Sequence, residues 1–222
     1  MIESDKQMSF SENEFSIFSI EGLDPRMTAI RASIQPRLYA LGETAAEFLT
    51  AKVDTISFPV HVAKHLRRTK YAPESTWAAI GGDKRGYKKY PHFQIAINRE
   101  YVAFWLAFID HPEHKEAIAD SLINEIDQLY SLPDSYVISL DHTKEKYVFL
   151  HDADVNKSLI RFRDVKKGEW MIGRLLEAGD ERVEDNQKLA TFMLETFDYL
   201  LPFYQSSLSI QLLEKEQKGL KG

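Results

Sequence analysis

The strongest structural signal in the chain lies in residues 92–109, which read HFQIAINREYVAFWLAFI. In its first half, bulky apolar residues alternate with Gln94, Ala96 and Asn98, the period of a strand with one buried face. A connection of two charged residues then leads to the apolar run Tyr101–Ile109. An uninterrupted apolar run of this length predicts a central strand that is covered on both faces.

Other segments with strand or helix patterns surround this stretch. Further strands are predicted at 76–80, 135–140, 146–150 and 170–176, and residues 58–68 are predicted to be a strand or an irregular segment. Helices are predicted at 25–48, 113–130, 152–162 and 181–213. The strands come in adjacent pairs and do not alternate with helices. The pattern therefore predicts an α+β fold, with a largely antiparallel sheet, flanking helices and a long C-terminal helix.

Local signals mark where helices start and bend. Ser11 and Glu14 have the spacing of a capping box, which predicts a short helix there. Pro36 lies inside the helix predicted at 25–48 and removes a backbone donor, so a kink or a break is expected at that point. Pro202 is expected to kink the last helix for the same reason.

The chain is predicted to be a single domain over residues 1–222, because it contains no repeat and no Pro/Gly/Ser-rich linker. Residues 1–9 and 214–222 are expected to be frayed at its ends. Cysteine is absent, which excludes disulfides, thiol nucleophiles and Cys-ligated metals. The sequence shows no signal-peptide pattern. It also contains no apolar run approaching the roughly 20 residues of a membrane span. A cytoplasmic protein without a membrane partner is expected.

Basic residues are concentrated between residues 58 and 92. This segment holds eight lysines and arginines against two acidic residues, a local charge of +6 in a chain whose net charge is −6. Arginine binds phosphate or carboxylate through two parallel hydrogen bonds, and lysine adds a mobile charge. The segment therefore predicts an anion site, whereas the alternative is a solvated loop that pairs with the acidic helix at 113–130. The predicted ligand-binding residues are Lys64, His65, Arg67, Arg68, Lys84, Arg85, Tyr87, Lys88, Lys89 and His92.

The seven histidines are the main candidates for chemistry in a cysteine-free chain. Imidazoles titrate near neutral pH, so His65, His92 and His142 are candidate general acids or bases. His142 lies in the sequence Asp141-His142-Thr143, which suggests an oriented imidazole. The HExxH pattern and other metal-ligand spacings are missing, so no metal site and no cofactor are predicted.

Several motifs together resemble those of the YktB-like family of uncharacterised bacterial proteins. They include HVAKHLRR at 61–68, KRGYKKYPHFQI at 84–95, Asp141-His142-Thr143 and Leu201-Pro-Phe-Tyr204, and they run in the same order from about Phe10 to Gln205. Ala96 departs from the pattern, in which glycine is expected. The resemblance implies a single α+β domain and supplies no catalytic residues.

Three functions are compatible with these patterns. The first is a binding protein for a phosphorylated or anionic ligand, a nucleotide or a short RNA, through the basic segment. The second is a phosphate-handling hydrolase with histidine as the acid or base. The third is an interaction module that dimerises through the last helix, where Tyr199, Phe203 and Tyr204 are either core residues or dimer contacts. The sequence leaves the oligomeric state open.

Overall fold

The computed structural model describes residues 6–53, 56–109 and 111–219, and its central element is an antiparallel sheet. The seven strands lie in the order β1-β2-β3-β4-β7-β5-β6, and each pairs antiparallel with its neighbours. They are β1 (Val60–Val62), β2 (Ser75–Ile80), β3 (His92–Asn98), β4 (Tyr101–Phe108), β5 (Val137–Ser139), β6 (Val148–Phe149) and β7 (Trp170–Glu177). The predicted α+β fold is confirmed.

The hairpin of β3 and β4 occupies the middle of the sheet, as the stretch 92–109 predicted. All eight residues of β4 are buried. The side chain of Asn98 closes the turn, because its carbonyl oxygen accepts hydrogen bonds from the backbone N–H groups of Glu100 and Tyr101, both at 2.8 Å. A short turn of this kind fixes the register of the strands on either side of it.

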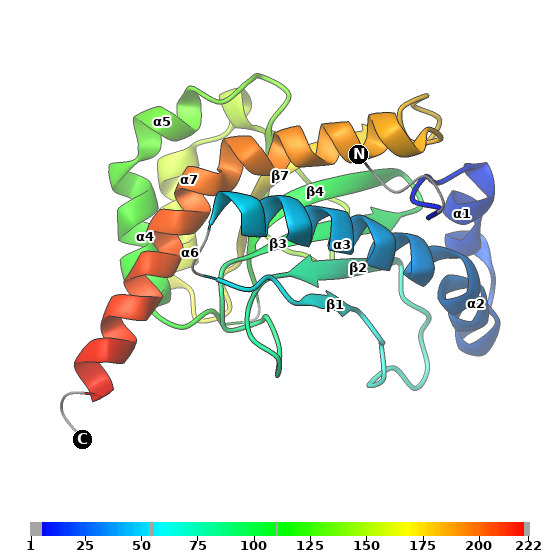
Figure 1. The fold of residues 1–222 in the computed structure, drawn as a ribbon, viewed down its shortest axis with the longest axis horizontal. Helices are drawn as coiled ribbons and strands as arrows, with labels where there is room; N and C mark the ends of the chain where they lie inside the picture. The colour runs from blue at the N-terminus through cyan, green and yellow to red at the C-terminus, as the bar shows by residue number, and fades with distance from the viewer. Residues whose placement is uncertain (1–5, 54–55, 110, 220–222) are drawn as a thin grey trace.

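Helices cover one face of the sheet, where α3 and α7 lie side by side (Figure 1). The α-helices are α1 (Glu12–Ser16), α2 (Leu23–Ala29), α3 (Gln35–Lys52), α4 (Lys115–Asn124), α5 (Ile126–Tyr130), α6 (Val155–Asp164) and α7 (Asn186–Gly219). The 3-10 helices are η1 (Ile17–Ser19) and η3 (Leu150–Asp152), and the π-helix η2 (Ile30–Ile34) joins α2 to α3. One large apolar core fills the space between these helices and the sheet.

The predicted helices are present, and their ends differ from the predicted ones by up to six residues. Ser11 and Glu14 form the expected capping box of α1. The break expected at Pro36 is the π-helix η2, after which the proline lies in the first turn of α3. Its missing N–H needs no partner at that position. The helix predicted at 113–130 begins only at Lys115 and divides at Glu125 into α4 and α5.

The described parts of both chain ends belong to hydrogen-bonded structure. In the segment 1–9, the backbone N–H groups of Met8 and Ser9 donate to the side-chain oxygen of Asn186, at 2.9 and 2.7 Å. Residues 1–5 lie outside the described residues. At the other end, α7 continues to Gly219 instead of ending at Leu213, and residues 220–222 lie outside the described part.

The aromatic residues of α7 mostly belong to the core. Phe203 and Tyr204 are 3% and 1% exposed, and Tyr204 packs against Phe58 and Phe93. They are therefore not available as dimer contacts, whereas Tyr199 is exposed. Among the described residues, none of the helices is both long and apolar enough to span a membrane.

Gly173 in β7 gives a test of the central pairing. A Cβ atom at this position would meet the backbone oxygen of Phe104 on β4, and backbone cannot move aside as a side chain can. We expect Gly173→Ala to lower the free energy of unfolding by about 3 kcal/mol, measured by denaturant unfolding. Gly86→Ala is the matched control, because a Cβ there would have no atom within 4 Å. Equal stability of the two variants would contradict the assigned register.

Candidate functional site

The face of the sheet opposite α3 and α7 carries polar and aromatic residues. Along β3, Phe93, Ile95 and Ile97 belong to the large core, so His92 and Gln94 point to the other side. A second, smaller apolar cluster lies on that side, and Tyr87 and Tyr147 from two loops pack against it. We call this side the loop-covered face.

Trp77 and Tyr87 form the centre of the site on the loop-covered face. The indole Nε1 of Trp77 donates a hydrogen bond to the Tyr87 hydroxyl at 2.8 Å. Two imidazoles lie near each ring, with centroid distances between 4.7 and 5.7 Å. The six residues, which we call the histidine cluster, are His61, His65, Trp77, Tyr87, His92 and His142. The three candidate catalytic histidines of the sequence therefore surround one aromatic pair.

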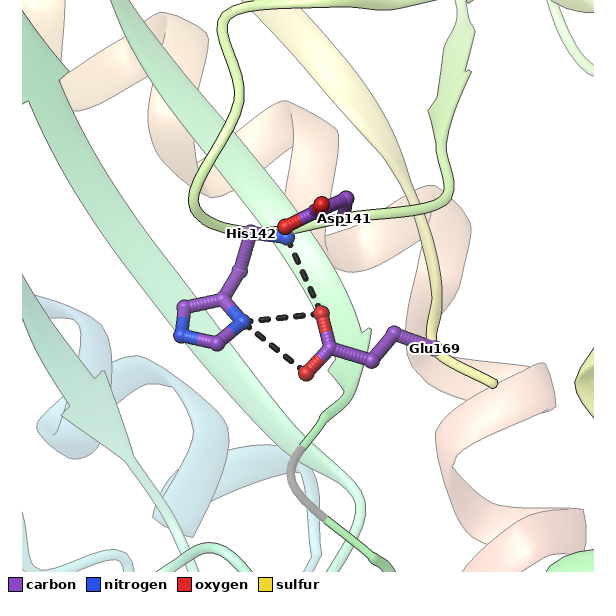
Figure 2. Close-up of side chains that lie close together, drawn as sticks. All are labelled: Asp141, His142 and Glu169. Carbon is purple, nitrogen blue, oxygen red and sulfur yellow. Dashed lines mark hydrogen bonds and ion pairs between the residues drawn. The ribbon is translucent and has the colours of Figure 1, made fainter. Parts of the chain in front are cut away.

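His142 is held by Glu169, which lies directly before β7. The ring Nδ1 is 2.9 and 2.8 Å from the two carboxylate oxygens of Glu169, and the backbone N–H of His142 also donates to this carboxylate, at 3.0 Å (Figure 2). The other ring nitrogen, Nε2, points away from Glu169. The Glu169 and His142 side chains are only 13% and 15% exposed. A carboxylate that fixes one imidazole nitrogen leaves the other free to exchange a proton with a substrate.

Asp141, the sequence neighbour of His142, has a different role from the one that the motif suggests. Its carboxylate accepts hydrogen bonds from the backbone N–H and the hydroxyl of Thr143, at 2.9 and 2.6 Å. Burial alone would raise the pKa of Asp141, but these hydrogen bonds lower it and keep the group ionised. The imidazole is therefore oriented by Glu169, and Asp141 shapes the loop.

Asp141, His142 and Glu169 are also a group that could hold a metal ion. Their ligand atoms lie within 4.8 Å of one another. His142 Nδ1 is already at hydrogen-bond distance from Glu169, so an ion would have to replace the proton between them. The donor set of one imidazole and two carboxylates would suit zinc or another divalent transition metal.

His92 is a neutral imidazole with an unused acceptor. Its Nδ1 is 2.9 Å from the backbone oxygen of Tyr90, and a carbonyl only accepts, so Nδ1 carries the proton. Burial lowers the pKa of His92 to about 4, which leaves Nε2 as a bare lone pair at neutral pH. This atom, Gln94 Oε1 and His61 Nε2 are buried without a hydrogen-bond partner among the described residues. Buried polar atoms without partners are costly and commonly mark functional sites.

His65 has an unusual backbone conformation. Its φ of 52° lies in the left-handed region, which residues other than glycine rarely adopt. The ring Nε2 is 3.0 Å from the Thr76 hydroxyl, and the ring edge meets Trp77. Burial, together with the cations Arg68 and Arg31, lowers the pKa of His65 to about 4. His65 is therefore a neutral hydrogen-bonding group. Its ring contacts Trp77, and the ring of His142 contacts the same indole.

A small cavity of about 30 Å³ opens beside the histidine cluster, which is room for one or two water molecules. Trp77, Gln94 and His142 contribute to its wall. The remaining lining residues are Glu74, Ser75, Ala96, Ile97, Asn98, Tyr101, Trp105, Ser139, Thr143, Lys144, Glu145 and Met171. Burial raises the pKa of Tyr101 to about 12, so its hydroxyl stays protonated.

The predicted basic residues divide into two groups. The segments 61–68 and 84–92 meet where the rings of His61 and Tyr87 lie 5.7 Å apart. Their cations, however, flank opposite ends of β2, which is about 17 Å long at about 3.3 Å per residue. One group is Lys64, Arg67 and Arg68, and the other is Lys84, Arg85, Lys88 and Lys89; all seven residues are exposed.

Lys89 and Arg68 are among the cations that contact other parts of the protein. Lys89 pairs with Glu113 at 3.0 Å, just before the acidic helix, which is the contact expected from the solvated-loop alternative. Arg68 donates to the backbone oxygens of Tyr71 and Ala72 at 3.3 and 3.4 Å.

Three residues of the site were not predicted from the sequence. Trp77 lies inside a predicted strand and is half-buried on the loop-covered face. Gln94 could have been found, because it is a polar residue on a strand that is otherwise buried. Glu169 had no local signal, since it lies 27 residues after the histidine that it contacts.

Comparison with known proteins identifies the family. Residues 10–204 match a family described as a domain of unknown function, DUF1054. The chain belongs to the DUF1054 family. This match spans nearly the same residues as the resemblance predicted from the motifs and confirms it at the level of an uncharacterised bacterial family.

Individual members of the family resemble the chain over most of its length. It is 46% identical over 200 residues to a UPF0637 protein of Oceanobacillus iheyensis. The aligned residues make up 90% of this chain and 96% of the relative. A UPF0637 protein of Enterococcus faecalis is 43% identical over 202 residues, 91% of this chain and 99% of the relative. A third UPF0637 protein, from Listeria monocytogenes, is 42% identical over 199 residues. The aligned residues make up 90% of this chain and 97% of the relative. The similarity thus spans nearly the whole of these relatives.

Acid should destabilise the protein through His92. Its pKa of about 4 in the folded state is below the ordinary value of 6.5, so the unfolded chain binds the extra proton between these two values. The free energy of unfolding should therefore fall as the pH is lowered from 6.5 to 4, by about 3 kcal/mol, with no contribution above pH 6.5. Denaturant unfolding at a series of pH values, compared between wild type and His92→Gln, measures this contribution.

His151→Gln serves as the control, because the His151 side chain is 53% exposed. The control should keep the pH dependence of the wild type, and His92→Gln should make it shallower by the contribution of His92, leaving that of His65. A His92→Gln profile as steep as that of the wild type would show that His92 is not held neutral by the fold.

Proposed function

We propose that this protein is a cytoplasmic hydrolase of small phosphorylated molecules, with His142 as its general base. The observation that carries the proposal is the His142–Glu169 pair at the wall of a water-sized cavity. A water molecule in this cavity would lie beside an imidazole whose other nitrogen is fixed by a carboxylate. This is the arrangement that activates a nucleophile in many hydrolytic sites.

The proposed step is the attack of water on phosphorus. His142 takes a proton from the water as its oxygen forms a bond to phosphorus, and the ester P–O bond breaks. The imidazolium, stabilised by the Glu169 carboxylate, then gives the proton to the departing alkoxide. His65 and His92 would remain neutral and would orient the substrate through hydrogen bonds, because their pKa values of about 4 make them poor proton donors at neutral pH.

The anionic part of the substrate would be bound by the loop that carries Tyr87. Lys84 and Arg85 of this loop are exposed, and Tyr87 itself belongs to the histidine cluster. A phosphate between this loop and the cluster would be attracted by the local positive charge. Lys64, Arg67 and Arg68 flank the other end of β2 and supply a second positive region.

Binding without catalysis is the second candidate function, and the same basic residues favour it. The two candidates differ in whether product forms. A protein that only binds would retain affinity for phosphate compounds and release no phosphate. Short RNA is the alternative ligand, and the cavity of about 30 Å³ favours a small group over a stacked base.

Hydrolysis is tested by measuring phosphate release from a panel of phosphomonoesters and strand cleavage of short oligoribonucleotides, with chelator-treated protein. We expect His142→Asn to lower kcat by about 10²- to 10⁴-fold, the usual contribution of a general base. Glu169→Gln should lower kcat by roughly 10- to 100-fold and shift the pH profile, because an amide can hold the imidazole in the wrong tautomer.

The matched control for these two variants is His151→Asn, which changes an exposed histidine of η3 that is not part of the histidine cluster. Its kcat should equal that of the wild type. Wild-type protein that turns over none of the substrates but still binds them would support the binding candidate. Turnover that His142→Asn leaves unchanged would refute the proposed base.

The loop that carries Lys84, Arg85 and Tyr87, which we call the basic loop, has a separate test. The double variant Lys84→Glu/Arg85→Glu should weaken the binding of phosphorylated ligands at least tenfold, measured by calorimetric titration. Lys52→Glu/Lys188→Glu makes the same change in net charge on α3 and α7, away from the loop-covered face, and should bind like the wild type. Equal affinity of both double variants would rule out phosphate binding by this loop.

A further inference from the structure

The connection between β1 and β2 combines positive charge with exposed apolar side chains. Residues 64–71, which we call the Leu66 segment, contain four lysines and arginines and no acidic residue. Leu66 and Tyr71 are 80% and 70% exposed, more than any other large apolar side chain among the described residues. In Figure 1 the segment extends past β1, which is the edge strand of the sheet. The two most exposed apolar side chains thus lie within one stretch of cations.

Hydrogen bonds fix both ends of the Leu66 segment. The backbone N–H of Ala63 donates to the backbone oxygen of Trp77 at 2.9 Å, and the backbone oxygen of Ala63 accepts from Gln35 Nε2 at 2.9 Å. At the other end, the buried Arg26 donates to the backbone oxygen of Pro73 at 3.1 Å. The segment therefore starts and ends at fixed positions on the fold.

The backbone inside the segment turns at Leu66. The φ of 52° at His65 lies in the left-handed region, and the ring of His65 is held at 3.0 Å from the Thr76 hydroxyl. The backbone N–H of Arg68 donates to the backbone oxygen of His65 at 3.1 Å, which makes Leu66 and Arg67 the central residues of a tight turn. A strained backbone and an apolar side chain in water both cost free energy, and such costs are typical of functional sites.

Positive charge dominates the surface around this turn. Within the part of the chain that the structure describes, no ion pair to a carboxylate forms at Lys64, Arg67 or Lys70. The next acidic residue along the chain is Glu74, whose charge is matched by Arg26 at 3.0 Å. An anionic surface would therefore be attracted here.

The side-chain types favour a lipid surface over a nucleic acid. A base stacks on an aromatic face. Leu66 has no ring, however, and one face of Tyr71 already carries the Lys70 ammonium, 5.2 Å from the ring centroid. At a membrane, an aliphatic side chain enters the acyl region, a tyrosine lies at the level of the headgroups and cations contact the lipid phosphates. Binding of this kind needs no membrane-spanning helix, so the absence of one among the described helices does not bear on it.

We propose that the Leu66 segment docks the protein on an anionic phospholipid surface. Leu66 would enter the boundary below the headgroups, and Tyr71 would lie at their level. The lipid phosphates would be contacted by Lys64, Arg67 and Lys70. The contact does not depend on the proposed hydrolysis, because Leu66 and Tyr71 belong neither to the histidine cluster nor to the lining of its cavity.

Vesicle flotation of the full chain tests the electrostatic part of this proposal. Wild-type protein should float with vesicles of equal parts phosphatidylglycerol and phosphatidylcholine, and not with vesicles of phosphatidylcholine alone. Each basic residue near an anionic surface contributes about fivefold in affinity at low salt, so Arg67→Gln/Lys70→Gln should weaken binding at least tenfold. Lys52→Gln/Lys188→Gln removes the same charge from α3 and α7 and should bind like the wild type.

The apolar part of the proposal is tested by changing Leu66. Leu66→Ser should weaken binding to the anionic vesicles at least fivefold, because it removes apolar surface that would leave water. Leu213→Ser is the matched control, since Leu213 is 58% exposed on α7, and it should bind like the wild type. Leu66→Trp should still bind, and the fluorescence of the added indole should shift to the blue when anionic vesicles are present. Thermal unfolding shows that each of these surface variants is folded.

Three results would overturn the proposal. Wild-type protein that binds neither kind of vesicle, or both kinds equally, would show that the segment does not recognise anionic lipid. Binding that Leu66→Ser leaves unchanged would exclude insertion. Tighter binding of an oligouridylate than of the anionic vesicles, lost in Tyr71→Ala, would assign the segment to RNA. Phosphate release from soluble phosphomonoesters tests the proposed function separately and is not affected by any of these outcomes.

Discussion

The antiparallel pairing of β3 (His92–Asn98) with β4 (Tyr101–Phe108) is the constraint on which the rest of the structure depends. Successive side chains of a strand point to opposite faces, so this pairing sends Phe93, Ile95 and Ile97 into the helical core. It necessarily sends His92 and Gln94 to the loop-covered face. A shift of one residue would exchange the two sets and bury two polar side chains among the helices, at a cost that the core could not offset.

The loop-covered face is completed by residues from other segments of the chain. The loop after β2 supplies Tyr87, and the loop after β5 supplies His142, which Glu169 holds from the start of β7. α7 stabilises this arrangement from the opposite side of the molecule. Its Gln211 donates to the backbone oxygens of Lys89 and Glu113, at 2.7 and 3.1 Å, and so ties the basic loop to the segment before α4. The helical layer thereby supports a loop that belongs to the site.

The net charge of −6 conceals a separation of charge that the fold preserves. The fold places exposed cations at both ends of β2, Lys84 and Arg85 at one end and Arg67 and Arg68 at the other, and neutral imidazoles lie between them. His65 and His92 stay neutral because burial opposes their protonation. Charge on these rings would add to the positive charge of the cations at the two ends, and burial instead keeps the centre of the site neutral.

The sequence alone determined the α+β class, the central hairpin, the capping box of α1 and the break near Pro36, because these depend on local periodicity and backbone chemistry. It also indicated His65, His92 and His142 as candidates, since a chain without cysteine has few other groups that titrate near neutral pH. Only the tertiary structure decided that these histidines share one aromatic centre and that Glu169 orients His142. Such contacts join segments far apart in the chain, and their geometry depends on strand order and register, which local patterns do not encode.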